Sequence, residues 1–152
     1  MDALQALKNT LLFQDVPESI LTLVAACAEE RTIPGGAPIV SSHQTTDSLY
    51  VILRGSVQGT RGGEATPIVL GPGQSFGQVG LLDGGPVGLT VLALDPTELL
   101  VLEGAKLREK LRGNHEAGHL LYRAVATSLA SRLRRAVDAL VLATEGTSKQ
   151  AR

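Results

Sequence analysis

FGQVGLL at residues 76–82, followed by PVGLT at residues 86–90, is a glycine-rich segment built like a phosphate cradle. Gly77 can begin a short helix whose free backbone N–H groups point outward, and glycine lets a phosphate approach such donors closely. Neither stretch contains a charged side chain, although a charged contact normally completes a phosphate site. The segment therefore has the expected backbone of an anion site without the expected charges.

The composition limits the classes of protein to consider. A chain of 152 residues suits one domain with one sizeable core. Its 14 Lys and Arg against 15 Asp and Glu give a net charge of -1, which creates no global attraction to nucleic acid or anionic lipid. The single Cys27 has apolar neighbours and indicates a buried helical thiol in a reducing cytoplasm. No signal peptide or membrane-spanning stretch is expected.

The pattern of residues divides the chain into helices, then sheet, then helices. Residues 1–30 are expected to hold a short amphipathic start and a helix that has Pro17 in its first turn and runs to about Glu29 or Glu30. Residues 31–103 alternate short apolar runs with Gly and Pro turns, which predicts antiparallel strands in a small barrel or roll. Residues 104–143 return to a helical pattern.

The last helical segment is long and carries a repeating apolar stripe. Asn114 can cap its start, the helix is expected to end near Ala143, and residues 144–152 are expected to form a flexible tail. Spacings of three and four follow a heptad pattern and predict a seam for a partner helix, most simply that of a second copy. The residues of this seam are Tyr122, Ala126, Leu129, Leu133, Ala136 and Leu140. The alternative is that the stripe packs only on the barrel of its own chain.

Three motifs, in this order of elements, resemble the cyclic-nucleotide-binding domain family over roughly residues 10 to 143. Leu12-Phe13 with Val16-Pro17 looks like the entry helix of that family, and SLYVILRGSV at residues 48–57 looks like its central hairpin. LGPGQSFG at residues 70–77 resembles the turn into its phosphate-binding cassette. The resemblance implies an α+β fold, an antiparallel beta-roll flanked by N-terminal helices and a long C-terminal helix.

The same resemblance implies which residues would form the ligand site. They lie in the cassette, residues 76–90, and are Phe76, Gly77, Gln78, Val79, Gly80, Pro86, Val87, Gly88, Leu89 and Thr90. In the family an acid that contacts the ribose and an arginine that pairs with the cyclic phosphate complete the site, and here those positions are Gln78 and Val87. An arginine contact of this kind contributes about 1.5 to 3 kcal/mol, roughly ten to a hundredfold in affinity, so ordinary cyclic AMP binding is not expected.

The resemblance, together with the missing charges, implies a regulatory module with a degenerate ligand site, which is expected to need no cofactor and not to be an enzyme. Homodimerisation through the last helix, or docking to a regulatory protein, is the expected role of the seam. One alternative is a structural turn with no ligand. Another is genuine binding of a cyclic mono- or dinucleotide, with Arg54 or Arg61 replacing the missing cassette arginine.

Two further patterns compete with this interpretation. HEAGH at residues 115–119 places His115, Glu116 and His119 in the order used by zinc hydrolases, but a third ligand is not evident, and an exposed helix start is the alternative explanation. Arginines 123, 132, 134 and 135 make the last helix locally basic, which a solvated helix face also explains. Too few residues follow the long helix for a DNA-recognition module, so sequence-specific DNA binding is not expected.

Overall fold

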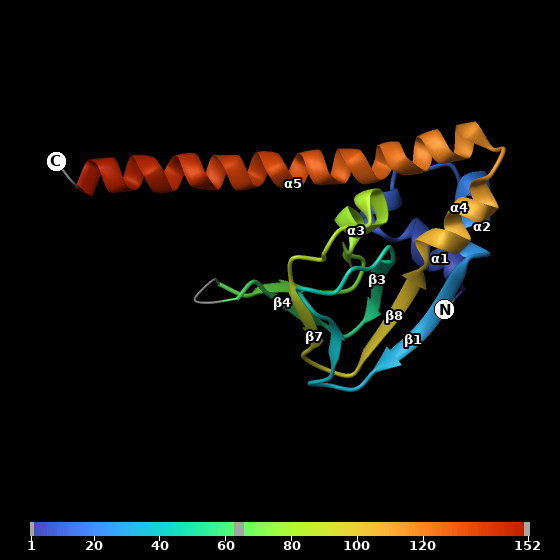
Figure 1. The fold of residues 1–152 in the computed structure, drawn as a ribbon, viewed down its shortest axis with the longest axis horizontal. Helices are drawn as coiled ribbons and strands as arrows, with labels where there is room; N and C mark the ends of the chain where they lie inside the picture. The colour runs from blue at the N-terminus through green and yellow to red at the C-terminus, as the bar shows by residue number, and fades with distance from the viewer. Residues whose placement is uncertain (1, 63–65, 151–152) are drawn as a thin grey trace.

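The computed structural model describes residues 2–62 and 66–150 of the chain. Three short helical segments begin it, α1 (Ala3–Lys8), η1 (Leu11–Phe13) and α2 (Glu18–Ala25). Eight strands and the short helix α3 (Gln78–Asp83) follow, and α4 (Gly104–Leu111) and the long α5 (His115–Gln150) complete the chain. Figure 1 shows the strands grouped in one body, with α5 running over α3 and projecting well beyond it.

The strands form two antiparallel sheets of four strands each. The first has the order β1 (Ala28–Ile33), β8 (Thr97–Leu102), β3 (Leu49–Arg54) and β6 (Ser75–Phe76). The second has the order β2 (Pro38–Val40), β7 (Thr90–Ala93), β4 (Val57–Thr60) and β5 (Ile68–Leu70). This architecture, with helices at both ends of the chain, confirms the predicted α+β roll.

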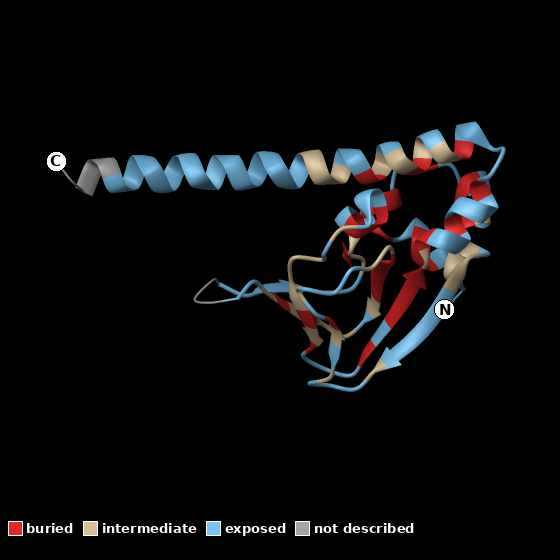
Figure 2. Ribbon diagram, viewed as in Figure 1, coloured by how far each residue is buried: buried red, intermediate tan, exposed pale blue. Residues whose placement is uncertain are grey.

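The two faces of the first sheet contribute to two separate cores. On β3, Leu49 and Val51 pack with the helices, whereas Tyr50 and Ile52 point to the second sheet inside the roll. Strand β8 follows the same alternation. Because both faces are covered, these strands read in the sequence as continuous apolar runs rather than as alternating ones. Figure 2 shows the buried residues concentrated on these strands and on the helices nearest to them.

The helix predicted to reach Glu29 or Glu30 ends earlier than expected. Helix α2 stops at Ala25, with Pro17 as its N-cap, and residues 28–33 pair with β8 in register from Ala28 with Leu102 to Ile33 with Thr97. Strand pairing thus overrides the local helical preference of this segment. Cys27 consequently lies after the helix, partly buried, with Sγ 3.7 Å from the carbonyl oxygen of Lys106.

The last helix starts as predicted and ends later. The side-chain oxygen of Asn114 accepts a hydrogen bond from the N–H of Ala117 at 3.1 Å, which is the expected cap. The helix then continues past Ala143 to Gln150. The hydroxyls of Thr144 and Thr147 donate to the carbonyls four residues earlier, so these residues are accommodated within the helix. The domain boundary at 143 stays a prediction, and residues 151–152 of the expected tail lie outside the described residues.

Among the helices of the described residues, we find none whose length and apolarity would let it cross a membrane.

Candidate functional site

The cassette begins with a short helix that is pressed against the loop before β3. Gly77 caps α3 with φ of 91°, a left-handed conformation that favours glycine. A Cβ on Gly77 would lie 2.5 Å from the carbonyl oxygen of Ser48, and one on Gly80 would collide with the carbonyl of Thr46. Glycine at both positions is therefore required by the approach of this loop, residues 46–48, whether or not a ligand binds.

Gln78, which stands at the position of the ribose-binding acid, is occupied by other contacts. Its side chain is 2% exposed and donates from Nε2 to the hydroxyl of Ser75 at 2.9 Å. Its Oε1 accepts from Nη1 of Arg132 at 3.5 Å, and Nη2 of Arg132 donates to the carbonyl of Ser75 at 3.0 Å. A side chain of α5 thus closes over the start of the cassette.

Sequence reasoning missed Arg132, which we expected on a solvated face of the last helix. The residue as a whole is exposed, but its guanidinium end is partly buried against the cassette. Burial lowers the pKa of Arg132 from its ordinary value, and repulsion from Arg135 lowers this pKa further. No local pattern distinguishes Arg132 from the neighbouring arginines 134 and 135, so the sequence contains no signal for this contact.

Val87 and Leu89 at the far end of the cassette are directed into the protein. Both side chains are partly buried and pack against the core inside the roll, which includes Tyr50, Phe76 and Val91. Cδ1 of Leu89 comes within 3.6 Å of the point where a Cβ on Gly59 would lie. Apolar side chains therefore occupy the inner side of the cassette, at the end where the resemblance places the family's arginine contact.

The backbone donors next to these residues already have partners. The N–H of Val87 donates to the carbonyl of Gln44 at 3.1 Å, and the N–H of Gly88 donates to the carbonyl of Ser42 at 3.2 Å. The hydroxyl of Thr90 accepts from the N–H of Ser42 at 3.1 Å. A phosphate at this end of the cassette would have to displace the loop at residues 42–44.

The two arginines considered as replacements for the missing one lie in different places. Arg54 at the end of β3 is 3.8 Å from Glu98 of β8, on the first sheet. Arg61 follows β4, and its Nη2 is 3.9 Å from the point where a Cβ on Gly88 would lie. Arg61 therefore stands beside the cassette and Arg54 pairs elsewhere.

The remaining expected site residues divide between the interior and the surface. Phe76, the residue before Gly77, stacks on Tyr50 with ring centroids 4.8 Å apart. Pro86 forms an isolated antiparallel β-bridge with Thr45. Val79 on α3 is 47% exposed. The structure thus brings most of the predicted residues into one continuous cassette but leaves Val79 and Pro86 exposed at the surface.

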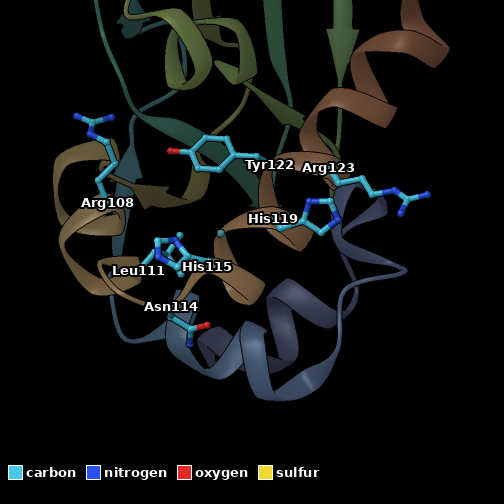
Figure 3. A pocket seen from close by; sticks show the side chains of 8 residues that line it. Arg108, Leu111, Asn114, His115, His119, Tyr122 and Arg123 are labelled. Carbon is cyan, nitrogen blue, oxygen red and sulfur yellow. The ribbon is translucent and has the colours of Figure 1, made fainter.

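The HEAGH stretch lies at the start of α5, beside an open cavity. Within the described ranges, no three His, Cys, Asp or Glu side chains cluster closely enough to hold a metal ion. His115 and His119 instead line a cavity of about 500 Å³, together with Arg108, Leu111, Tyr122 and Arg123 (Figure 3). We call this cavity the elbow pocket, because it lies where α4 meets α5.

The predicted seam on α5 is covered in part by its own domain. Leu129 packs against the core beneath the helices, and Tyr122 is partly buried. Ala126, Leu133, Ala136 and Leu140 are exposed, Leu133 and Leu140 each to 66%. The part of the stripe after Ser131 therefore remains without a partner within the described chain.

Comparison with known proteins places these features in a family. The model of the cyclic nucleotide-binding domain matches residues 30–114. The cyclic AMP receptor protein of Thermus thermophilus is 33% identical over 100 residues, which cover 63% of this chain and 46% of that protein. A cyclic nucleotide-gated potassium channel of Mesorhizobium japonicum is 33% identical over 94 residues, covering 62% of this chain and 26% of the channel. The chain thus spans less than half the length of these relatives.

Solved structures agree with the sequence comparison. The catabolite activator protein of Thermus thermophilus superposes with a TM-score of 0.75 at 31% identity, covering 88% of this chain and 62% of the other. The N-terminal domain of a transcriptional regulator from Streptomyces coelicolor gives 0.71 at 28% identity, covering 89% and 94%. Because the family model covers more than half of the chain and the roll, cassette and long helix follow the same fold, the chain belongs to the cyclic nucleotide-binding domain family.

Proposed function

We propose that this chain is a non-enzymatic regulatory module whose cassette does not bind cyclic AMP in the usual way. The observation that carries the proposal is the packing of Val87 against the core inside the roll. A valine offers a phosphate neither a charge nor a hydrogen-bond donor, and refilling its place with a charged ligand group would desolvate that group. The name of the Thermus relative states that it receives cyclic AMP, and the apolar cassette end argues that this chain differs.

The hydrogen bonds of the loop at residues 42–44 support the same conclusion. They use the N–H groups of Val87 and Gly88, which would otherwise be available to an anion. A ligand would have to replace these bonds as well as displace apolar side chains. Breaking each of these hydrogen bonds would make ligand binding less favourable by about 0.5 to 1.5 kcal/mol, the net contribution of one such bond to stability.

Arg132 is the proposed link between the cassette and α5. It joins the helix to Ser75 and Gln78 at the start of the cassette through two hydrogen bonds. A ligand or protein that engaged Gln78 would compete with Arg132 and release this part of α5. Such coupling requires that the ligand or protein bind with different affinities to the two states of the domain, one with this part of α5 held and one with it released.

We further propose that α5 associates with the α5 of a second copy through the exposed seam at Leu133, Ala136 and Leu140. Large apolar side chains on a projecting helix are favourable only when a partner covers them. Docking to a different regulatory protein is the other outcome that this surface allows. Sedimentation of the purified chain at high micromolar concentration distinguishes a dimer from a monomer.

Calorimetric titration with cyclic AMP, cyclic GMP and cyclic di-GMP tests the cassette. We expect no binding by the wild type in the micromolar range. Val87→Arg should create measurable affinity, whereas Val79→Arg, which adds the same charge on the exposed face of α3, should not. Thermal melting of both variants checks that they fold. Micromolar binding of any of the three nucleotides by the wild type contradicts the proposal.

A genuine cyclic nucleotide sensor is the second candidate, and the position of Arg61 favours it. Its guanidinium lies beside Gly88, one residue from the place of the missing arginine. If the wild type binds one of the nucleotides, Arg61→Ala should weaken the affinity at least about tenfold, the cost of a charge-assisted contact. Arg54→Ala serves as the control, because Arg54 pairs with Glu98 instead.

A further inference from the structure

The segment between β2 and β3 has little regular structure of its own, and we call its residues 42–48 the strap. Thr45 forms an isolated β-bridge with Pro86 of the cassette. Within the strap, the N–H of Ser48 donates to the hydroxyl of Thr46 at 3.2 Å, a contact between near neighbours. Because such short-range contacts do not fix a long segment, the conformation of the strap depends on the parts of the protein that it touches.

One end of the strap is bonded to the second half of the cassette. The N–H of Val87 donates to the carbonyl of Gln44 at 3.1 Å. The N–H of Gly88 donates to the carbonyl of Ser42 at 3.2 Å, and the N–H of Ser42 donates to the hydroxyl of Thr90 at 3.1 Å. These bonds exist only while the strap lies along the cassette. The two cassette amides therefore become accessible only when the strap moves away.

The other end of the strap is wedged between two helices. Each of the three consecutive carbonyls of residues 46–48 approaches a glycine closely. The first and third press on Gly80 and Gly77, which belong to α3 and its N-cap. The middle one, that of Asp47, would lie 2.6 Å from a Cβ on Gly104, the first residue of α4. Because all three glycines lack a side chain, the backbone of the strap can contact α3 and α4 at once.

The side chain of Asp47 adds an ion pair to this contact with α4. Its Oδ2 accepts a hydrogen bond from Nη2 of Arg108 at 2.7 Å, and both side chains are partly exposed. A Cβ on Gly104 would lie 2.8 Å from this Oδ2 and 2.9 Å from Nη1 of Arg108, so glycine also makes room for the pair. Both α3 and α4 contact α5 (Figure 1). The strap thus joins the cassette to the helices that support α5.

We propose that the strap is a coupling device that holds the cassette and α4 together and releases them together. In place, it covers the amides of Val87 and Gly88 and holds α4 through Asp47. A ligand or partner that takes these two amides must lift the strap, which separates Asp47 from Arg108. Linkage is reciprocal, so loosening α4 must also uncover the cassette amides. The coupling is independent of the proposed function, and only its use in regulation rests on it.

Hydrogen exchange of the full chain, followed by NMR without any ligand, tests the device. The amides of Val87 and Gly88 report on the cassette end. The amide of Leu107 donates to the carbonyl of Glu103 in the first turn of α4 and reports on the other end. The amides of β3 and β8 supply the reference, because central strands of a core exchange through global unfolding. Rates relative to this reference therefore measure opening of the strap alone.

Breaking the ion pair perturbs the α4 end. Asp47→Ala should speed exchange of Val87 and Gly88 about two- to fivefold relative to the reference, the effect of one partly exposed ion pair. Both amides donate to other residues of the strap, so this effect must pass along its backbone. Glu109→Ala is the matched control, because it removes an ion pair of α4 with Arg112 that does not involve the strap. Cassette amides that respond equally to both variants, or to neither, overturn the proposal.

Removing a hydroxyl perturbs the cassette end. Thr90→Val keeps the shape of the side chain and deletes the acceptor of the N–H of Ser42. It should speed exchange of Leu107 in α4 about two- to tenfold relative to the reference, the effect of one hydrogen bond. Thr60→Val deletes a hydroxyl of the neighbouring strand β4 that does not contact the strap, and should leave Leu107 unchanged. A Thr90→Val variant that alters the cassette amides alone contradicts the coupling.

The double variant shows whether the strap opens as one unit. A single opening predicts that Asp47→Ala and Thr90→Val each speed exchange at both ends by the same factor, and that together they give the product of the two factors. Separate local openings predict a change only at the altered end, which overturns the proposal. These measurements use no nucleotide, so the coupling and the proposed function can fail separately.

Discussion

The two halves of α5 carry similar apolar residues but lie in opposite environments. In the first half, Ala117, Leu121 and Val125 are buried against the helices of the domain. In the second half, all residues from Ser131 to Thr147 are exposed, including Leu133 and Leu140 (Figure 2). Periodicity therefore reveals that a stripe exists, but the rest of the chain decides whether that stripe is covered. The variants below test whether the second half is a partner surface.

The largest expected effect comes from truncating one side chain in the buried half of α5. Leu121 is 1% exposed, so Leu121→Ala should lower the free energy of unfolding by about 2 to 5 kcal/mol. Leu142→Ala, at a position 68% exposed, should change it by less than about 0.5 kcal/mol. Urea unfolding of both variants at low protein concentration measures the difference. Equal losses would mean that the second half is buried in the solution monomer.

A charge on the exposed half tests self-association. Leu133→Glu should raise the dissociation constant of the dimer about a hundredfold or more, because a carboxylate in an apolar seam must lose its hydration. Ser131→Glu adds the same charge away from the seam and should have a much smaller effect. Sedimentation equilibrium gives both constants. A wild type that stays monomeric at high micromolar concentration removes the seam hypothesis.

Removing the contact of Arg132 with the cassette should have an intermediate effect on the free energy of unfolding. Arg132→Ala should destabilise the fold by about 1 kcal/mol, since it removes two partly exposed hydrogen bonds and leaves the carbonyl of Gln78 without this donor. It should also speed amide exchange in α3. Arg134→Ala is the matched control on the same helix. If the two variants behave alike, Arg132 does not hold the cassette.

The smallest expected effect is that of substituting either of two glycines of α5 that have open space around them. A Cβ on Gly118 or on Gly146 meets nothing within 4 Å. Gly118→Ala should raise the free energy of global unfolding by about 0.5 to 1 kcal/mol, because alanine favours the helix. Gly146→Ala should raise helicity by circular dichroism without moving the global transition of the monomer. A matching gain from Gly146→Ala would show that the far end of α5 unfolds together with the domain.

The sequence predicted the strands and the long helix because their signals are local. The apolar run from Leu49 to Ile52 and the cap at Asn114 are such signals, and both are confirmed. The predicted C-terminal ends of α2 and α5 were wrong. The end of α2 depends on a strand that is remote in the sequence, and the end of α5 depends on a glycine that the helix tolerates. Residues 28–33 become a strand only through β8, and Gly146 does not interrupt the helix.

The candidate site was predictable in position and less so in its contacts. The resemblance of residues 70–90 to the family's cassette implied its position, and it also identified Val87 as standing where the family has its arginine. The contacts of Arg132 with Gln78 and of Arg61 with Gly88 join segments far apart in the chain. The carbonyl of Thr46 against Gly80 is equally remote. Such contacts depend on tertiary structure, which local spacing does not encode.

The placement of the two tyrosines has a spectroscopic consequence. The chain has 2 Tyr and no Trp, so tyrosine dominates its intrinsic fluorescence. Tyr50 stacks on Phe76 at the entrance of the cassette, and Tyr122 lines the elbow pocket. The cassette and the elbow pocket therefore each contain one natural fluorophore. The two tyrosines emit in the same band, so substituting phenylalanine for one of them leaves the other as the single emitter. Each such variant would report, without a label, on the surroundings of one tyrosine.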